Sequence, residues 1–321
     1  MDMTKKGESA MENKERIAAL FGEIVGDWRV QVDCPLSRMT TFKIGGPAAY
    51  VVTPSSVEEL KKIIEVCREN GLKMLVLGKG SNILASDEGF RGVIVRLDFN
   101  FNNVKIDGTL VEAESGITLS ALAKKAAEKG LGGLEFASGI PGTLGGAVYM
   151  NAGAYGGEMK DIIKEVTVLD TAGQLRILSC SELNLGYRSS VLQYKSWIVV
   201  KAVLQLEERD PALIKARMQE LKEQRNAKQP VEMPSAGSVF KRPEGYFAGT
   251  LIDQAGLKGY CVGGAMVSPK HAGFIVNNGD ATCKDVIGLI RHVQKTIKEK
   301  DGVDLVPEIR YLTPLGIDVI R

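Results

Sequence analysis

Apolar residues recur three and four positions apart in several segments of the chain, and capping residues bound these segments. The clearest segment covers residues 57–71: Ser55 and Ser56 precede it, Glu59 completes a capping-box pattern, and Gly71 ends it. Such spacing is typical of an amphipathic helix with one buried face. The same criteria predict helices over residues 11–25, 118–130, 211–228, 250–255 and 282–300.

Short apolar or alternating runs between turn residues predict strands. Residues 74–77 come directly after the helix predicted over residues 57–71 and have the composition of a buried strand. Thr171-Ala172-Gly173 separates two alternating runs, as a hairpin turn does. Residues 36–50 carry Thr, Gly and Pro and are predicted to form a loop. The predicted strands cover residues 74–77, 92–97, 110–114, 165–170, 174–179, 197–206, 238–241, 274–277 and 305–312.

Helices and strands alternate without the long crossovers of a doubly wound sheet, so the expected fold class is α+β. With 321 residues the chain exceeds the roughly 250–300 residues at which a single core stops growing. Asp210 and Pro211 provide an N-cap and a first helical residue where a boundary is expected. We expect three domains: residues 1–97 (an N-terminal helix plus α/β), 98–209 (β-rich) and 210–321 (α+β).

Composition excludes several classes of partner. Charged residues make up 25% of the chain and the net charge is +2 with both signs interspersed, so we expect no nucleic-acid partner. The polar N-terminus and the absence of an 18-residue apolar run predict no signal peptide and no membrane span, hence a cytoplasmic location. No obligatory protein partner is evident.

Cysteine and histidine usage makes a disulfide framework or a metal centre improbable. The chain has five cysteines without a Cys-x-x-Cys pair and only two histidines, His271 and His292. We therefore expect no metal ion and no Ser-His-Asp triad.

The main chemical signal is a glycine-rich segment, residues 139–157. Glycine has no Cβ and lets main-chain N–H groups approach a bound anion. Gly145 and Gly146 precede an apolar run that is expected to begin a helix with its N-terminus towards a phosphate, as in a diphosphate cofactor. The alternative is a mobile surface loop, but such loops are usually charged and this segment has no charge before Glu158.

A second glycine segment, residues 78–82, follows the predicted strand 74–77. It is not a Walker A loop, because Gly80 rather than Ser or Thr follows Lys79, and Ile83 stands where the Rossmann pattern requires a third glycine. Alone it indicates a turn as readily as a phosphate site. Two such segments in one chain favour a nucleotide-type cofactor.

Three polar residues in other motifs are candidates for chemistry, each with a simpler alternative. Arg188 lies in a polar turn and offers a planar fork for a carboxylate, although most arginines are solvated. Ser238 lies between a glycine and a strand; it is a common turn former, yet without a nearby histidine it suits a proton donor better than a nucleophile. Glu308 shares a predicted strand face with Arg310, which is typical of a solvated edge.

Six motifs follow one another along the chain: Gly-Lys-Gly-Ser-Asn (78–82), the glycine segment 138–156, Tyr-Arg-Ser-Ser (187–190), Ala-Gly-Ser-Val-Phe-Lys (236–241), Leu-Ile-Asp-Gln-Ala-Gly-Leu-Lys-Gly (251–259) and Pro-Glu-Ile-Arg-Tyr (307–311). In this order they closely resemble the UDP-N-acetylenolpyruvoylglucosamine reductase family, from about Thr40 to Leu312. The resemblance implies a non-covalent FAD enzyme of peptidoglycan synthesis that uses NADPH to reduce the enolpyruvyl ether of a UDP-sugar to UDP-N-acetylmuramate. It also implies a two-subdomain FAD-binding fold of the vanillyl-alcohol-oxidase type and a C-terminal substrate-binding domain.

The resemblance also implies residue roles. Arg188 and Glu308 would bind and polarise the substrate carboxylate, with Glu308 either protonated or bridged through a cation, and Ser238 would protonate the carbon beside the carboxylate after hydride transfer. Contacts to the UDP-sugar or the nicotinamide cofactor are expected from Tyr187, Arg225, Lys228, Arg242, Lys258 and His271. The expected FAD-binding residues are Leu77, Gly78, Lys79, Gly80, Ser81, Asn82, Ile83, Leu84, Ser138, Gly139, Ile140, Pro141, Gly142, Thr143, Gly145, Gly146, Ala147, Asn151, Ala152, Gly153 and Ala154.

One subgroup of the family carries a long insertion with a substrate-closing tyrosine between the catalytic arginine and serine, and this chain lacks it between Arg188 and Ser238. Two other functions remain as alternatives. An FAD-dependent alcohol or sugar oxidase of the same fold would keep the glycine segments without needing Arg188, Ser238 and Glu308 together. A non-catalytic nucleotide-binding protein would need no proton donor.

Overall fold

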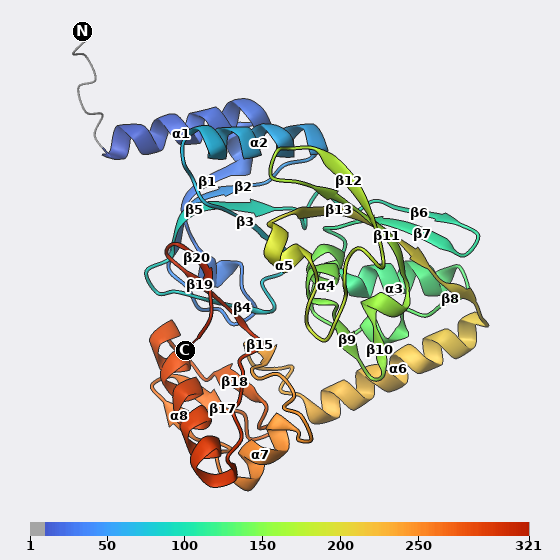
Figure 1. The fold of residues 1–321 in the computed structure, drawn as a ribbon, viewed down its shortest axis with the longest axis vertical. Coiled ribbons are helices and arrows are strands. Elements are labelled where there is room, and N and C mark those ends of the chain that lie inside the picture. Colours follow the sequence, from blue (N-terminus) through green and yellow to red (C-terminus); the bar gives the residue numbers. More distant parts are fainter. Residues whose placement is uncertain (1–9, 321) are drawn as a thin grey trace.

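The computed structural model describes residues 10–320, so the polar N-terminal residues 1–9 and residue 321 lie outside it. The first part of the chain forms a four-stranded sheet in the order β1-β2-β5-β3, in which β2, β5 and β3 are parallel and β1 is antiparallel. Helices α1 and α2 lie together along one side of this sheet (Figure 1). The elements are α1 (Ala10–Val25), β1 (Val30–Pro35), β2 (Pro47–Val52), α2 (Val57–Glu69), β3 (Met74–Leu77) and β5 (Phe90–Arg96).

The caps predicted for α2 form as expected, with one change in partner. Ser56 is the N-cap, and its Oγ accepts from the Glu59 main-chain N–H at 3.1 Å. The Glu59 carboxylate accepts from the Ser55 N–H at 2.7 Å, rather than from the cap residue itself. The apolar face of α2 then packs into the cluster that contains Val93 and Val95 of β5.

The middle of the chain forms a five-stranded antiparallel sheet in the order β12-β11-β13-β7-β6. The hairpin between β11 and β12 is confirmed: Asp170 Oδ1 accepts from the Ala172 and Gln174 N–H groups, and Gly173 has φ 77°. One apolar cluster joins this sheet to α3 and α4. The elements are β6 (Val104–Asp107), β7 (Leu110–Glu114), α3 (Leu119–Glu128), α4 (Leu144–Met150), β11 (Ile163–Leu169), β12 (Leu175–Ser179) and β13 (Ile198–Gln205).

Helix α6 (Pro211–Lys228) runs diagonally from the right-hand edge of the molecule, next to β8, towards the C-terminal part (Figure 1). Asp210 caps it, accepting from the Ala212 N–H at 2.8 Å, as the Asp-Pro pair predicts. The C-terminal part contains a four-stranded sheet, β15-β18-β17-β16, and two helices. Its elements are β15 (Ser235–Ser238), α7 (Ala248–Gln254), β16 (Cys261–Val262), β17 (Ala265–Val267), β18 (Phe274–Asn277) and α8 (Cys283–Asp301).

The end of the chain returns to the first part of the molecule. Strand β19 (Arg310–Thr313) pairs in parallel with β4 (Ile83–Ala85) and antiparallel with β20 (Gly316–Asp318). This pairing brings the residues before Arg310 next to the segment 78–82 that precedes β4. The remaining short elements are β8 (Leu131–Gly132), β9 (Gly153–Ala154), β10 (Gly157–Glu158), α5 (Leu192–Lys195) and β14 (Glu207–Glu208).

Three predictions, one of a loop and two of strands, were wrong. Residues 238–241 were predicted as a strand, but the strand is Ser235–Ser238, and Phe240 makes only an isolated bridge. Residues 36–50 were predicted as a loop, but strand β2 begins within this range, at Pro47. Its partner strand β1 was not predicted, because three of the six residues of β1 are exposed and the strand lacks a clear apolar pattern. Residues 305–312 were predicted as one strand, but only Arg310–Thr313 is a strand. The part before it makes a single bridge, from Pro307 to Phe240. Short strands defined by tertiary pairing carry little periodicity of their own.

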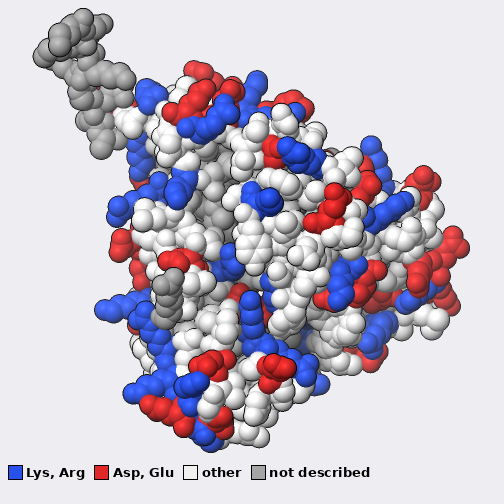
Figure 2. Space-filling view, in the orientation of Figure 1, with Lys and Arg blue, Asp and Glu red and all other residues white. Residues whose placement is uncertain are grey.

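Charged side chains of both signs are interspersed over the face seen in Figure 2. Among residues 10–320, no helix is both long and apolar enough to cross a membrane. Within the same residues, no three His, Cys, Asp or Glu side chains are grouped in a way that would hold a metal ion.

Polar contacts fix the C-terminal part on the first part of the chain. Asp87 reaches the start of α8, where its carboxylate accepts from the N–H groups of Cys283 at 2.8 Å and Lys284 at 3.1 Å. These N–H groups have no partner within the helix, and the helix dipole favours a negative charge there. Thr41 adds a bond to the Ser235 carbonyl at 2.6 Å.

Replacing Asp87 should therefore weaken the attachment of α8. We expect Asp87→Ala to cost about 1.5 to 3 kcal/mol, the usual value of hydrogen bonds to a charged group, and to lower the thermal midpoint by a few °C. Asp301→Ala, at the other end of α8, removes an acidic side chain near the negative end of the dipole and should not destabilise the protein. Calorimetry of both variants checks this; equal midpoints for Asp87→Ala and the wild type would contradict it.

Candidate active site

The two glycine segments predicted from the sequence lie against each other. A Cβ at Gly78 would be 2.4 Å from Thr143 Oγ1, and a Cβ at Gly142 would be 3.6 Å from Ser81 Oγ. The first distance is too short for any side chain, so Gly78 is required for the contact. Segments about 60 residues apart in sequence thus form one surface of bare main chain.

The segment 78–82 is fixed by contacts with residues on the protein side of the loop. Gly80 has φ 60°, and a Cβ there would be 2.3 Å from the Met39 carbonyl oxygen. Lys79 Nζ lies 3.3 Å from the Asp98 carboxylate, whose side chain is fully buried and also receives two bonds from Arg96. Lys79 therefore forms an ion pair with the buried Asp98 carboxylate, and this pair fixes the loop.

Gly145 and Gly146 at the start of α4 have different surroundings. A Cβ at Gly145 would be 3.0 Å from Ser115 Cβ, so protein packing excludes a side chain there. Gly146 is exposed, and the nearest atom to a Cβ there is Thr143 Oγ1 at 3.7 Å. Packing within the protein therefore does not account for the absence of a side chain at Gly146, and its open side leaves room for a ligand.

Two buried polar atoms beside the main glycine segment have no hydrogen-bond partner. One is Oγ of Ser115, the residue whose Cβ lies against Gly145; the other is Nε of Arg225, which would lie 2.9 Å from a Cβ at Gly139. Burial lowers the pKa of Arg225, and the Tyr155 ring centroid is 5.8 Å from its guanidinium carbon. Buried polar groups are normally paired. These atoms, together with the glycine cradle, fit a bound polar cofactor of the FAD type.

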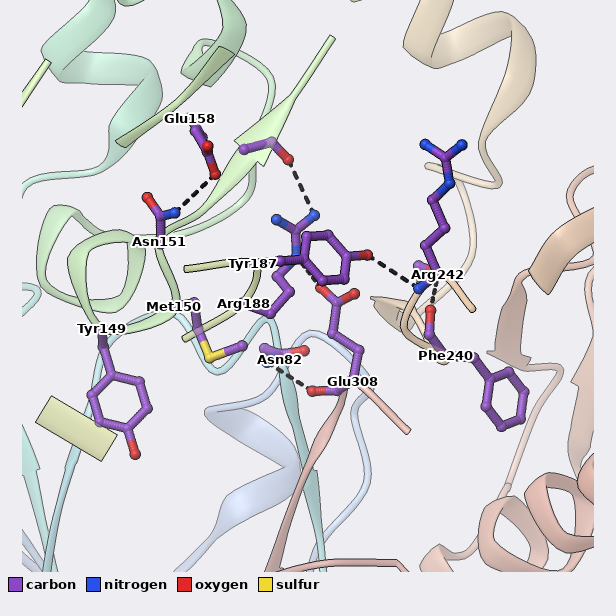
Figure 3. Close-up of polar contacts among 12 residues, drawn as sticks. Asn82, Tyr149, Met150, Asn151, Glu158, Tyr187, Arg188, Phe240, Arg242 and Glu308 are labelled. Atoms are coloured by element: carbon purple, nitrogen blue, oxygen red, sulfur yellow. Dashed lines mark hydrogen bonds and ion pairs between the residues drawn. The ribbon is translucent and has the colours of Figure 1, made fainter. Parts of the chain in front are cut away.

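Arg188 lies in a tight turn with φ 53°, closed by two main-chain bonds between Gly186 and Ser189. Its Nε donates to Glu308 Oε1 at 2.5 Å, and its Nη2 donates to the Gly153 carbonyl at 3.2 Å (Figure 3). Both side chains are largely buried, with 20% of Arg188 and 14% of Glu308 exposed. The arginine thus links the main glycine segment to the end of the chain.

The Glu308 and Ser238 segments are paired with each other. The Glu308 N–H donates to the Val239 carbonyl at 2.7 Å, and the Lys241 N–H donates to the Val306 carbonyl at 2.8 Å. Asn82 of the second glycine segment donates to the Glu308 carbonyl at 3.4 Å (Figure 3). The structure therefore pairs the side chains of Arg188 and Glu308 and brings the main-chain segment of Ser238 next to that of Glu308, beside the glycine surface.

Burial raises the pKa of Glu308, while the nearby Arg188 and Lys241 charges oppose that rise. The solvated strand edge considered for Glu308 is wrong. Ser238 Oγ makes one long bond, 3.3 Å to the Phe240 carbonyl. The hydroxyl is therefore only weakly fixed by the protein and is free to turn towards a ligand.

Tyr187 and Arg242 lie next to one another beside Arg188 (Figure 3). The Tyr187 hydroxyl accepts from the Arg242 main-chain N–H at 3.2 Å, and the Arg242 guanidinium carbon lies 4.0 Å from the centroid of the exposed Phe247 ring. Sequence reasoning named the first two and missed Phe247, whose exposure only the structure reveals. Exposed aromatic side chains are a common feature of ligand-binding surfaces.

The other predicted substrate contacts have local partners. Lys258 forms an ion pair of 2.6 Å with Asp253, and Lys228 is the exposed last residue of α6. His271 is half-buried, and burial lowers its pKa, so its neutral ring accepts from the Gly273 N–H through Nδ1 at 3.1 Å. None of these contacts places the three side chains at Arg188.

Several predicted cofactor residues have side chains that serve the protein interior. Leu77, Leu84 and Ala147 are buried in apolar clusters, so only their main chains are able to face a ligand. Asn151 is fully buried with φ 42°; its Nδ2 donates to Glu158 and to the Gly186 carbonyl, and its Oδ1 accepts from the Lys160 N–H. Its amide fixes the Arg188 turn onto the glycine segment.

Two family models match the chain. Residues 48–179 match an FAD binding domain, and residues 229–312 match the C-terminal domain of UDP-N-acetylenolpyruvoylglucosamine reductase. The expected α+β fold, an FAD-binding fold followed by a C-terminal domain of this family, is confirmed.

Curated relatives and a solved structure agree with these matches. The chain is 51% identical over 290 residues to UDP-N-acetylenolpyruvoylglucosamine reductase of Caldanaerobacter subterraneus subsp. tengcongensis, covering 90% of this chain and 96% of the relative. It is 52% identical over 293 residues to the enzyme of the same name from Lachnoclostridium phytofermentans, covering 90% and 94%. The crystal structure of UDP-N-acetylenolpyruvylglucosamine reductase from Thermus caldophilus is 40% identical with a TM-score of 0.77, covering 88% of this chain and 98% of that one.

The open space at Gly146 generates a prediction. Gly146→Val adds a side chain that meets no protein atom closely, so the fold should persist while FAD is lost from the purified protein. Gly288→Val is the matched control: its Cβ also finds only a 3.4 Å contact, to Val262 in the C-terminal part. Flavin absorbance per protein and circular dichroism check both variants. Full flavin occupancy in Gly146→Val would contradict the cradle assigned here.

Proposed function

The chain belongs to the UDP-N-acetylenolpyruvoylglucosamine reductase family, and we propose that Arg188, Ser238 and Glu308 are its catalytic residues. It is an FAD-containing, NADPH-dependent oxidoreductase that reduces the enolpyruvyl ether of the UDP-sugar to UDP-N-acetylmuramate in peptidoglycan precursor synthesis. The observation that supports the residue roles most is the buried Arg188–Glu308 pair, with Arg188 Nε 2.5 Å from Glu308 Oε1, on a segment that is hydrogen-bonded to the residue after Ser238. The alternative of an alcohol or sugar oxidase is not favoured.

The main-chain groups of residues 78–82 and 142–146 would hold FAD, which would accept a hydride from NADPH and supply it to the terminal carbon of the enolpyruvyl group. The protein side chains would then stabilise the negative charge left on the substrate and supply the proton that completes the reduction. Hydride addition leaves negative charge that delocalises over the adjacent carbon and the carboxylate, so cationic and hydrogen-bond-donating groups at the carboxylate lower the barrier.

Arg188 is suited to bind that carboxylate. A guanidinium has five N–H donors, of which the structure uses Nε for Glu308 and one N–H of Nη2 for Gly153. The remaining donors offer a planar fork to a substrate carboxylate. The pair with Glu308 orients this fork before the substrate arrives.

Glu308 is suited to act as a neutral acid. Burial raises its pKa, so its protonated form persists to a higher pH than that of an exposed glutamate. A neutral carboxyl donates a hydrogen bond to the substrate carboxylate, whereas an ionised one repels it. Ser238, whose own bond to Phe240 is long, would donate the proton to the carbon next to the carboxylate.

We also propose substrate contacts at Tyr187, Arg225, Lys228, Arg242, Lys258 and His271, and domains at residues 1–97, 98–209 and 210–321. Separate apolar clusters support the last two domains, one drawn from residues 111–206 and one mainly from residues 236–320. The interspersed surface charge favours a small UDP-sugar over nucleic acid as partner. A cytoplasmic location accords with the use of NADPH and a nucleotide sugar.

Ser238→Ala tests the proton-donor role by separating the two half-reactions. Flavin reduction by NADPH needs no proton from Ser238 and should keep its wild-type rate. Reoxidation by the enolpyruvyl UDP-sugar should slow roughly 10²- to 10⁴-fold, the usual contribution of a positioned general acid. Anaerobic stopped-flow absorbance measures both phases. Equal loss in both would assign Ser238 to the flavin site, and normal reoxidation would remove it from the mechanism.

A pH profile tests the role of Glu308. If the protonated form is active, reoxidation should decline as pH rises through the pKa of Glu308. Lys241→Gln removes a positive charge that favours the ionised form, so it raises this pKa and should move the decline to higher pH. Lys241→Arg keeps the charge and should leave the profile in place. An unchanged or downward-shifted profile in Lys241→Gln would exclude Glu308 as the titrating acid.

A further inference from the structure

Gln193, in the short helix α5, lies directly behind the Arg188 turn. Its Nε2 donates to the Arg188 carbonyl at 3.0 Å and to the Tyr149 carbonyl at 3.1 Å. Its Oε1 accepts from Arg310 Nη1 at 3.3 Å. One half-buried carboxamide thus contacts three separate segments.

These three segments are the ones that build the site. Arg188 carries the proposed carboxylate fork, Tyr149 lies near the end of the glycine helix α4, and Arg310 is two residues after Glu308. Arg310 also places Nη2 3.5 Å from the Tyr149 hydroxyl, with its guanidinium carbon 5.9 Å from that ring centroid. The Gln193 amide therefore connects both members of the Arg188–Glu308 pair to the helix that begins at the cofactor surface.

The Arg188 turn needs such support. A residue other than glycine with φ 53° is strained, and the conformation persists only where its surroundings hold it. Two carboxamides hold the carbonyls of this turn: Asn151 binds that of Gly186 at 3.0 Å, and Gln193 binds that of Arg188. Gln193 is the one that also reaches the Glu308 segment.

We propose that Gln193 is a positioning residue for the reduction of the enolpyruvyl group. It fixes the main chain of Arg188 and, through Arg310, the segment of Glu308, so that guanidinium and carboxyl meet the substrate carboxylate in one geometry. This inference rests on the proposed function of Arg188 and Glu308. Gln193 itself touches no reacting atom, and it meets the main glycine segment only at Tyr149 and Met150, at the far end of α4 from Gly145 and Gly146.

The carboxamide is separable from the packing of α5. Leu192, with 1% of its surface exposed, belongs to the apolar cluster of the middle part and anchors the helix, whereas Gln193 makes the polar contacts described above. Removing the carboxamide should therefore leave the fold and the FAD content unchanged. A displacement of about 1 Å at a catalytic group costs on the order of 10²-fold in rate.

The test compares Gln193→Ala, Gln193→Glu and a matched control in an anaerobic stopped-flow experiment on the FAD-loaded enzyme. Gln193→Glu keeps the size and the acceptor for Arg310 but loses the N–H donors, so it should behave like the alanine variant. The control, Gln205→Ala, removes a carboxamide that also binds two acceptors, Thr109 Oγ1 at 2.7 Å and the Leu206 carbonyl at 3.1 Å, in β13. It should match the wild type in both phases.

In both Gln193 variants we expect flavin reduction by NADPH at the wild-type rate and reoxidation by the enolpyruvyl UDP-sugar slowed about 10²-fold. In Gln193→Ala the pH at which reoxidation declines should also rise, because a displaced Arg188 no longer opposes protonation of Glu308. A merely structural residue would not move this profile.

Wild-type reoxidation in both variants would overturn the inference, and so would an equal slowing of both phases, which indicates a damaged flavin site. If the wild-type enzyme were reduced by NADPH but not reoxidised by the enolpyruvyl UDP-sugar, the proposed function would fail and this inference with it. The wild-type reaction therefore distinguishes a failure of the proposed function from a failure of the role proposed for Gln193.

Discussion

The ion pair between Arg188 and Glu308 is the interaction on which the candidate site depends. The two residues are separated by 120 positions, and their side chains are largely buried at a distance of 2.5 Å. Burying two charges costs desolvation, which only good geometry and further hydrogen bonds offset. The parallel pairing of β19 with β4, the Val239 contact of Glu308 and the strained Arg188 turn together supply that geometry.

The glycine surface imposes a second constraint of a different kind. Gly78 and Gly145 are needed because neighbouring protein atoms occupy the space of a side chain, whereas Gly146 faces open space. Sequence alone treats all these glycines alike, because it records the missing Cβ but not what would meet it. The distinction between glycines that allow packing and glycines that leave room for a ligand requires the structure.

Much of the fold follows from local rules, and the parts that do not are tertiary. Helices with Ser56, Thr118, Asp210 and Thr282 as caps formed as predicted, because capping and amphipathic spacing are local. Strand β1, the irregular residues before Arg310 and the burial of Glu308 depend on partners far away in sequence. No sequence pattern indicates a role for Gln193, because its three partners, the carbonyls of Arg188 and Tyr149 and the guanidinium of Arg310, come together only in the folded chain.

The resting pair also has a consequence for binding. A substrate carboxylate that joins the guanidinium of Arg188 places a second negative charge beside Glu308, in a site where burial already raises the pKa of that carboxyl. Two carboxylates that share one site favour protonation of one of them. Under the proposed mechanism, substrate binding and proton uptake by Glu308 are therefore linked, and the acid is present when negative charge develops at the carboxylate.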